Sequence, residues 1–471
     1  MSERAFDYLT LDNAGSVFPG QNSSRWSNVF RLSVDIGREV EPDILDKALE
    51  NTLVRFPSLK VRMRYGFFSN YFEPNQAPCP INKDISNFCY RIGLKENNGY
   101  LFRVYYRKSR ISIDFYHALC DGHGGTVFIL TLAGEYLRLK GESISFNRYV
   151  LDTEAAASAE ELEDAYIRYC GDDASASLTD PTAYHKKGTA LPPHITHYTT
   201  VFMPFSRLHI LSKELGVTVT ELFAAILAEI HYRKQLQKYG RMKKPVSVQI
   251  PVNLRKFFPS DTLRNFVLCV TVRLDKRKEE YTFEEILQTV SSQLRKVNGK
   301  QAHGAYITRT VKIGAKAIRY VPVRIKNLII KIGFMFGAEY STSVLISNLG
   351  PVRLPEEMQK HISSLTFYTG PGLVNGARCG VACIGDRLAI TFSNCYKEDD
   401  IERDFLMKLS ALGIETTVET NRETDFGNIE GVTVDDREAY SDVAFIPGRF
   451  SAALPKYKLS FGKRIKRYFG A

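Results

Sequence analysis

The chain has 471 residues, of which 44% are hydrophobic and 24% charged, and its formal net charge is +11. This length and apolar content can bury a large core and predict two or three structural domains. Residues 1–15 lack an apolar core of signal-peptide length, and no run approaches the ~18 apolar residues of a membrane span, so we expect a cytoplasmic protein. Eight scattered cysteines without a C-x-x-C pair indicate reduced thiols, and nothing in their pattern argues for a redox or zinc role.

In the first half of the chain, the spacing of apolar residues predicts helices and strands whose order places one histidine. Residues 42–55 are predicted as a helix, 59–65 as a strand and 100–117 as a β-hairpin, and a further helix follows Gly125. The hairpin runs into the sequence YHALCDGHGG, so that His117 lies where a strand ends and a helix is about to begin. Such a junction is a suitable place for chemistry.

An acidic segment separates the two halves. Residues 152–180 contain nine acidic residues and one basic residue, and they are rich in Ala and Ser. Because the residues that follow, up to 196, show little periodicity, we interpret the region as a crossover. We therefore predict an N-terminal subdomain at 1–170, a linker at 171–196, a C-terminal subdomain at 197–415 and a C-terminal extension at 416–471.

The second half repeats the order of the first. Thr220 is predicted to cap a helix that runs to about residue 238, strands are predicted at 246–254, 266–274 and 387–394, and a helix at 400–412. The strand at 387–394 ends in Asn394, whereas the corresponding strand of the first half ends in His117. If the halves are related, only the first supplies a base.

His117, Asp121 and Gly122 form the pattern H-x-x-x-D-G. An imidazole has an ordinary pKa of roughly 6.5, so a neutral His117 can take a proton from a hydroxyl or amine near neutral pH. Asp121 can order the turn that aims the ring, and Gly122 allows the backbone to turn tightly. A buried structural histidine stays a second interpretation. A metal site of His117, Cys120, Asp121 and His123 is a third, but no second Cys/His pair at zinc-site spacing exists, and we predict no metal.

The motif at 117–122 resembles the active-site signature of the chloramphenicol acetyltransferase-like superfamily, which includes the condensation domains of peptide synthetases, plant BAHD acyltransferases and alcohol acetyltransferases. Three further segments are similar to the family and occur in family order: RFPSLKVRMR at 55–64, IPVNLRKFFPSDTLRNF at 250–266 and VLISNLGPV at 344–352. The resemblance covers about residues 5–415. It implies an α/β fold with mixed sheets, in which two related chloramphenicol acetyltransferase-like subdomains form a central tunnel.

Two departures narrow the resemblance. Condensation domains usually carry a second histidine directly before the catalytic one, where this chain has Tyr116. The Asp-Phe-Gly-Trp-Gly segment of the BAHD enzymes is absent, because Asn428 and Ile429 follow the Asp-Phe-Gly at 425–427. The resemblance therefore favours a small-molecule alcohol or amine acyltransferase over a plant BAHD enzyme or a synthetase module.

The resemblance also implies roles for individual residues. His117 would act as general base while an alcohol or amine attacks an acyl thioester directly, with acyl-CoA as co-substrate, no acyl-enzyme and no permanently bound cofactor. Arg255 would pair with Asp121 in a structural role. Ser347 and Asn348 are the first candidates for donors to the oxyanion and Asn265 a weaker one, although Ser347 and Asn348 also suit an ordinary turn at a strand end.

The positive charge of the chain is concentrated in one segment. Residues 286–338 contain ten basic residues and no acidic one, and Lys312, Lys316 and Arg319 are spaced to share one side of a helix. They form either a solvated face or a site for an anion, such as the phosphates of CoA, an acidic carrier protein or an anionic membrane. We expect no nucleic-acid partner, because no nucleic-acid-binding motif accompanies the charge.

Two functional alternatives and two further expectations complete the interpretation. A carrier-protein-dependent condensation or docking protein would differ in its thioester preference, and a metal-dependent hydrolase built on His117, Cys120 and His123 would bind metal. The six basic residues at 456–467 alternate with apolar ones, in either a disordered tail or a segment that touches an anionic membrane peripherally. We expect a monomer, because one chain holds both halves.

Overall fold

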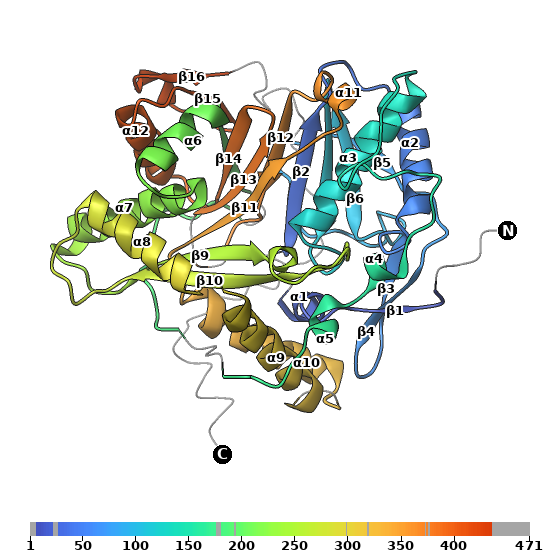
Figure 1. Cartoon of the computed structure of the whole chain (residues 1–471), viewed down its shortest axis with the longest axis horizontal. Helices are drawn as coiled ribbons and strands as arrows, with labels where there is room; N and C mark the ends of the chain where they lie inside the picture. Colours follow the sequence, from blue (N-terminus) through green and yellow to red (C-terminus); the bar gives the residue numbers. More distant parts are fainter. Residues whose placement is uncertain are drawn as a thin grey trace.

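The computed structural model describes residues 6–21, 27–175, 180–192, 195–297, 299–317, 320–372, 374 and 377–435. These residues form sheets of eight, five and three strands, with helices packed on their faces (Figure 1). One hydrophobic core lies around the five-stranded sheet and a second around the eight-stranded sheet. The mixed α/β fold predicted from the sequence is confirmed.

The sheet of the first half has the strand order β12-β2-β7-β6-β5. Its strands are β2 (Val29–Asp35), β5 (Ile81–Lys83), β6 (Phe102–Arg107), β7 (Arg110–Tyr116) and β12 (Ser364–Tyr368). Helix α3 (Gly122–Leu139) packs on β2 and β7 of this sheet, and helix α2 (Pro42–Arg55) packs on α3. A three-stranded sheet in the order β1-β4-β3 lies beside it, made of β1 (Leu9–Thr10), β3 (Val61–Tyr65) and β4 (Asn70–Pro74).

The sheet of the second half has the order β10-β9-β11-β13-β14-β8-β15-β16. Its strands are β8 (His197–Pro204), β9 (Val246–Asn253), β10 (Val267–Leu274), β11 (Val344–Val352), β13 (Ala377–Ile384), β14 (Arg387–Asn394), β15 (Thr416–Thr420) and β16 (Val432–Val434). The long helices of this half are α6 (Phe205–Glu214), α7 (Val219–Tyr239), α8 (Phe283–Val297), α9 (Lys300–Ala317), α10 (Val323–Phe334) and α12 (Asp400–Ala411).

Short helices connect these elements. They are η1 (Gly15–Val17), α1 (Phe18–Gln21), α4 (Ala159–Leu162), α5 (Ala165–Arg168), η2 (Leu254–Lys256), η3 (Met335–Glu339), α11 (Glu356–Gln359) and η4 (Phe426–Asn428). In Figure 1, α9 and α10 lie at the lower edge of the molecule, below β9 and β10. No helix among the described residues is long and apolar enough to span a bilayer.

Several predicted elements are confirmed, and the starts of two helices are corrected. Helix α2 and strand β14 match the predicted ranges. Helix α7 is capped by Thr218 and not by Thr220, because Thr218 and Glu221 form a reciprocal capping box in which each side chain binds the other's backbone N–H. Helix α3 begins at Gly122, earlier than predicted, because the Asp121 side chain accepts two backbone N–H bonds and caps it.

Two segments pair with a sheet that lies outside the part of the chain to which the sequence assigned them. Strand β12, from the predicted C-terminal subdomain, pairs antiparallel with β2 of the first half, from Ser364 opposite Asp35 to Tyr368 opposite Arg31. Residues 416–435, the first part of the segment expected as an extension, belong to the eight-stranded sheet, because β15 pairs with β8 and buries Val418. Residues 436–471, which include the basic tail, lie outside the described residues.

The acidic linker packs on the basic helix α9. Lys312 Nζ donates to the main-chain oxygen of Asp172 at 2.9 Å, and Arg309 Nη1 donates to that of Ala174 at 3.3 Å. The backbone N–H of Gly171 donates to the hydroxyl of Thr308 at 2.9 Å. Segments of opposite charge that are far apart in the sequence are thus neighbours in the fold.

Candidate active site

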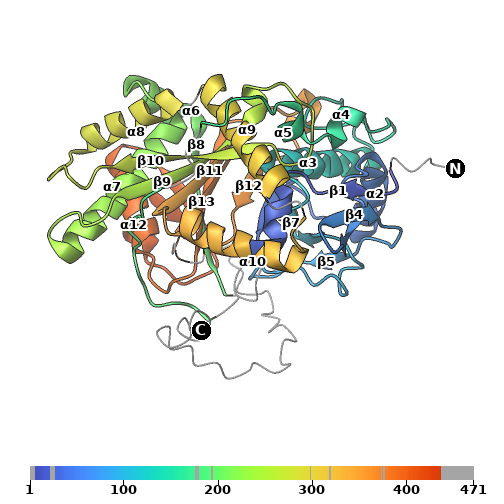
Figure 2. The ribbon, with the colours of Figure 1, turned by 90° about the horizontal axis from the view of Figure 1, so that it is seen from below.

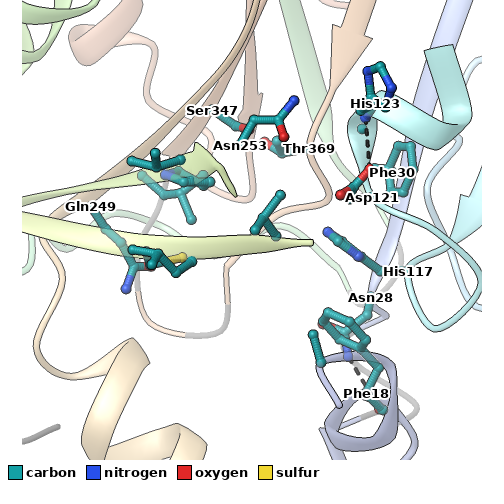
Figure 3. Close-up of a pocket in the computed structure, with 18 of the residues that line it drawn as sticks. Phe18, Asn28, Phe30, His117, Asp121, His123, Gln249, Asn253, Ser347 and Thr369 are labelled. Atoms are coloured by element: carbon teal, nitrogen blue, oxygen red, sulfur yellow. Dashed lines mark hydrogen bonds between the residues drawn. The ribbon is translucent and has the colours of Figure 1, made fainter. Parts of the chain in front are cut away.

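His117 follows the last residue of β7 and lines a cavity of about 1650 Å³ between the two halves. Its backbone N–H donates to the main-chain oxygen of Asn28 at 2.8 Å, which fixes the chain at this point. The imidazole stacks on Phe18, with ring centroids 4.5 Å apart, and meets Phe30 edge-on at 5.2 Å. The ring projects from the first half into the space that faces the second half (Figure 3).

The orientation of the His117 ring is set by a chain of two further side chains. His117 Nδ1 lies 2.9 Å from Asn265 Oδ1, and Asn265 Nδ2 donates to Asp12 Oδ2 at 3.1 Å. The carboxyl of Asp12 also accepts the backbone N–H groups of Gly15 and Asn265, and in its ionised form it accepts from the Asn265 amide as well, so that the amide oxygen faces the imidazole. Nδ1 therefore carries the proton, and Nε2 is left as the basic nitrogen.

The electrostatics of this group favour the neutral imidazole. Burial lowers the pKa of His117 below its ordinary value of 6.5, and the nearby carboxyls of Asp121 and Asp12 offset this only in part. Burial raises the pKa of Asp12, which is fully buried. At neutral pH His117 is thus unprotonated at Nε2, the state that a general base needs.

The predicted pairing of Asp121 with Arg255 is present. Arg255 Nη1 donates to Asp121 Oδ2 at 2.7 Å, and the same oxygen accepts the backbone N–H of Phe266 at 2.9 Å. The other guanidinium N–H groups donate to the main-chain oxygens of Thr262 and Arg264. Burial alone would raise the pKa of Asp121, but Arg255 and the N–H donors outweigh it and hold that pKa below 3.8. The pair joins the start of α3 to the loop before β10.

Gly122 and Gly124 allow close contacts at the start of α3. A Cβ at Gly122 would lie 2.5 Å from Leu349 Cδ2 on β11, which is a flexible side-chain end. A Cβ at Gly124 would lie 2.0 Å from the main-chain oxygen of Leu263, which cannot move aside so easily. The close contact between the halves therefore depends more strongly on Gly124 than on Gly122, the glycine of the motif.

The structure separates the three oxyanion candidates. Asn348 Nδ2 donates to Thr220 Oγ1 at 2.9 Å and Asn348 Oδ1 accepts the backbone N–H of Gly350 at 2.7 Å, so this amide builds the strand end. Asn265 is engaged with His117 and Asp12. Ser347 lines the cavity on β11, across from His117 (Figure 3). Of the three candidates, Ser347 is the one whose hydroxyl makes no hydrogen bond to the described part of the chain.

Thr369 is a further hydroxyl that the sequence did not single out. It lines the same cavity, close to Ser347 and Asn253 in Figure 3. Its buried Oγ1 has no hydrogen-bond partner among the described residues. No motif marks this threonine, so only the fold identifies it.

Among the side chains that the structure describes, no basic residue of α9 lines the cavity. Lys312 Nζ binds the linker carbonyl of Asp172, as described above, and Lys312 is not among the residues that line the cavity. The backbone of Lys316 lies in α9, and Arg319 lies outside the described residues. The geometry therefore assigns a linker contact to Lys312.

The residues of the proposed metal site do not converge. Among the described residues, no group of three or more His, Cys, Asp or Glu side chains is arranged to hold a metal ion. Cys120 is fully buried, which raises the pKa of its thiol, and burial together with Arg255 lowers the pKa of His123 to about 4. The rings of His117 and His123 point in different directions (Figure 3).

The comparison with curated proteins yields a distant relative of unknown function. No protein-family model matches the chain. An uncharacterised protein of Mycobacterium tuberculosis, from two strains, is 26% identical over 262 residues, which cover 52% of this chain and 57% of the relative. The chain thus spans little more than half the length of the curated relatives it matches.

Solved structures show the fold. TRI101 of F. graminearum, solved with coenzyme A and deoxynivalenol, has a TM-score of 0.59 at 13% identity and covers 88% of this chain and 100% of its own. The starter condensation domain of rhizomide synthetase, solved with C8-CoA, has a TM-score of 0.53 at 13% identity, with 86% and 94% covered. Polyketide synthase associated protein 5 from Mycobacterium tuberculosis scores 0.52 at 14% identity, with 84% and 96% covered. The chain shares their fold.

This fold agrees with the one that the H-x-x-x-D-G resemblance implied. The three neighbours cover 84–88% of the chain. Two of them were solved with coenzyme A or an acyl-CoA.

Proposed function

We propose that the protein is an acyltransferase that moves an acyl group from a coenzyme A thioester to the hydroxyl or amine of a small acceptor. The observation that carries the proposal is the state of His117: a neutral imidazole, held at Nδ1 by Asn265 and Asp12, that lines a cavity shared by both halves. A nitrogen held in this way can accept a proton without first reorienting.

The proposed reaction needs no covalent intermediate on the protein. His117 Nε2 takes the proton of the acceptor as its oxygen or nitrogen bonds to the thioester carbonyl carbon, giving a tetrahedral oxyanion. The oxyanion collapses, the carbon–sulfur bond breaks, and the imidazolium returns its proton to the departing thiolate. Ser347 is the proposed donor to the oxyanion, and Asp121 with Arg255 holds the start of α3 in place.

A second candidate is a condensation-type enzyme that takes its acyl group from a carrier protein. The observation that favours it is the presence of a condensation domain among proteins of the same fold. The two functions differ in the donor and not in the role of His117. The identity of the donor therefore has to be measured.

A thioester assay tests both candidates. The protein is incubated with pooled alcohols and amines and with acyl donors of several chain lengths, either as CoA thioesters or on the phosphopantetheine arm of an acyl carrier protein, and free thiol is recorded. We expect acceptor-dependent thiol release from the CoA thioesters. Release from the carrier-bound donors alone would favour the condensation-type function, and release independent of any acceptor would indicate a hydrolase.

The pH dependence of turnover follows from the lowered pKa of His117. The base acts when unprotonated, so kcat/KM should fall as the pH drops through the pKa of His117 in the folded protein, which lies below 6.5. At pH 7 and above, kcat/KM should be level. An alcohol acceptor is used so that the acceptor itself does not titrate. An acid limb centred above pH 6.5 would mean that another group limits the reaction.

Replacing Ser347 with alanine tests the proposed oxyanion donor. Loss of one such donor typically costs ~10²- to 10³-fold in kcat, and we expect a loss in this range with little change in KM. Asn348→Ala is the matched control on the same strand. It removes the contact with Thr220, so it should lower the melting temperature while kcat stays close to the wild-type value. A larger kcat loss for Asn348→Ala than for Ser347→Ala would reverse the assignment.

A further inference from the structure

Helix α10 presents an apolar stripe to solvent. Ile325, Leu328, Ile329 and Ile332 occur at positions i, i+3, i+4 and i+7 and are 48–58% exposed. This spacing places the four side chains on one face of the helix. None of the twelve residues of α10 is buried, which is unusual for a helix with this content of Ile and Leu.

A neighbouring loop enlarges the stripe. Phe67 and Phe68, between β3 and β4, are 71% and 46% exposed. The loop is joined to α10 by hydrogen bonds from the backbone N–H of Val323 to Phe67 O at 2.8 Å and from Lys326 Nζ to Phe68 O at 2.7 Å. We call the four aliphatic residues of α10 and these two phenylalanines the α10 patch. Contiguous exposed apolar surface of this kind marks an interaction site.

The inner face of the same helix forms part of the cavity wall. Asn327, Ile330 and Phe334 line the cavity, and α10 packs closely on α1 at Gly20. In Figure 2, which shows the molecule from below, α10 crosses the front of the view. Ile329, at one edge of the α10 patch, also lines the cavity, so the patch is an outer surface that borders the cavity that holds His117.

The charge around the α10 patch selects its partner. At 100° per residue, Arg324 and Lys331 fall on one side of the apolar stripe and Lys326 on the other. The chain carries no acidic residue from 286 to 338. An apolar face with aromatic residues and flanking cations is the pattern of helices that lie in the interface of an anionic bilayer.

We propose that the α10 patch docks on the surface of an anionic lipid bilayer. The helix would lie in the plane of the interface, with its aliphatic stripe among the upper acyl chains and with Arg324 and Lys331 at the headgroup phosphates. Phe67 and Phe68 would insert beside it. The inference goes beyond the proposed function and does not depend on it, because it concerns binding and not catalysis.

Sedimentation of the full-length protein with vesicles tests the proposal. We expect binding to vesicles of phosphatidylcholine with phosphatidylglycerol, much weaker binding to phosphatidylcholine alone, and a decrease with added salt. Leu328→Glu combined with Ile332→Glu should lower the partition coefficient about tenfold or more, since two apolar side chains become charged. Arg324→Gln and Lys331→Gln should each lower it roughly fivefold. None of these four residues lines the cavity, so turnover of soluble substrates should persist.

Two matched controls locate the effect. Met407→Glu changes another exposed apolar side chain, 54% exposed on α12, and should leave vesicle binding unchanged. A full-length variant with Lys463, Arg464, Lys466 and Arg467 changed to Gln tests the basic tail. The milder Leu328→Gln replaces the double variant if the latter does not fold, as judged by circular dichroism.

Three results would overturn the proposal. The wild-type protein could fail to bind anionic vesicles at low salt. The double variant could bind like wild type while the tail variant loses binding, which would assign the contact to the tail. A dimer seen by sedimentation velocity and abolished by Leu328→Glu with Ile332→Glu, without any vesicle binding, would show that the α10 patch pairs with a second copy of the chain.

Discussion

Replacing His117 with alanine is expected to lower kcat/KM for acyl transfer by about 10²- to 10⁴-fold, the usual contribution of a positioned general base. The fold should persist, because the ring faces the cavity and contacts two aromatic rings without filling a closed core. The expected loss of stability is about 1 kcal/mol, from the hydrogen bond that Asn265 no longer makes. Thiol release under saturating donor and a urea titration measure the two effects.

His209→Ala is a suitable control for this experiment, because His209 is an exposed histidine on α6, where it stacks on Phe205. It should retain wild-type kcat/KM. If His117→Ala kept activity within a few-fold of wild type, His117 would be a structural residue and the proposed mechanism would be wrong.

The second large effect concerns the ion pair of Asp121 and Arg255. Changing either residue to alanine leaves the other residue buried with no opposite charge beside it, which lowers the free energy of unfolding by about 3–5 kcal/mol. Asp121→Ala also removes the cap of α3, which adds about 1 kcal/mol. Because the two residues touch, the double variant should lose clearly less than the sum of the single losses.

Urea unfolding of the wild type, both single variants and the double variant gives the coupling energy. The pKa of Asp121 is lowered in the folded protein, so its stabilising contribution is present above the ordinary value of 3.8 and disappears as the pH falls through the lower folded value. The coupling should therefore be unchanged between pH 8 and pH 5. Additive losses in this range would mean that the ion pair does not hold the two segments together.

The parts of the fold that were predicted correctly are those determined by local sequence. Pro42 and Asp43 at the start of α2 and Arg55 at its end are typical helix-end residues, so the range of α2 could be predicted. The cap of α7 was placed two residues late because two threonines compete there. Only Thr218 has a glutamate three residues on, and that spacing was the available signal.

The candidate site was predictable where a motif or a segment similar to the family contains its residues. The H-x-x-x-D-G pattern identified His117 and Asp121, and the resemblance added Arg255, whose contact with Asp121 is present. Asp12 was missed because it is 253 residues from Asn265 and no pattern links the two. Asn265 was considered as an oxyanion donor, whereas its amide orients the imidazole through a contact that only the assembled fold creates.

Strand β12 has a consequence for how this chain is made. It completes the five-stranded sheet beside β2, and Ser363 and Asp35, which meet there, are 328 residues apart. At a translation rate of roughly 5–20 residues per second, the edge of β2 stays open for tens of seconds on the ribosome. An open edge strand can pair with other nascent chains, so the edge of β2 is exposed to such pairing until the last quarter of the chain emerges.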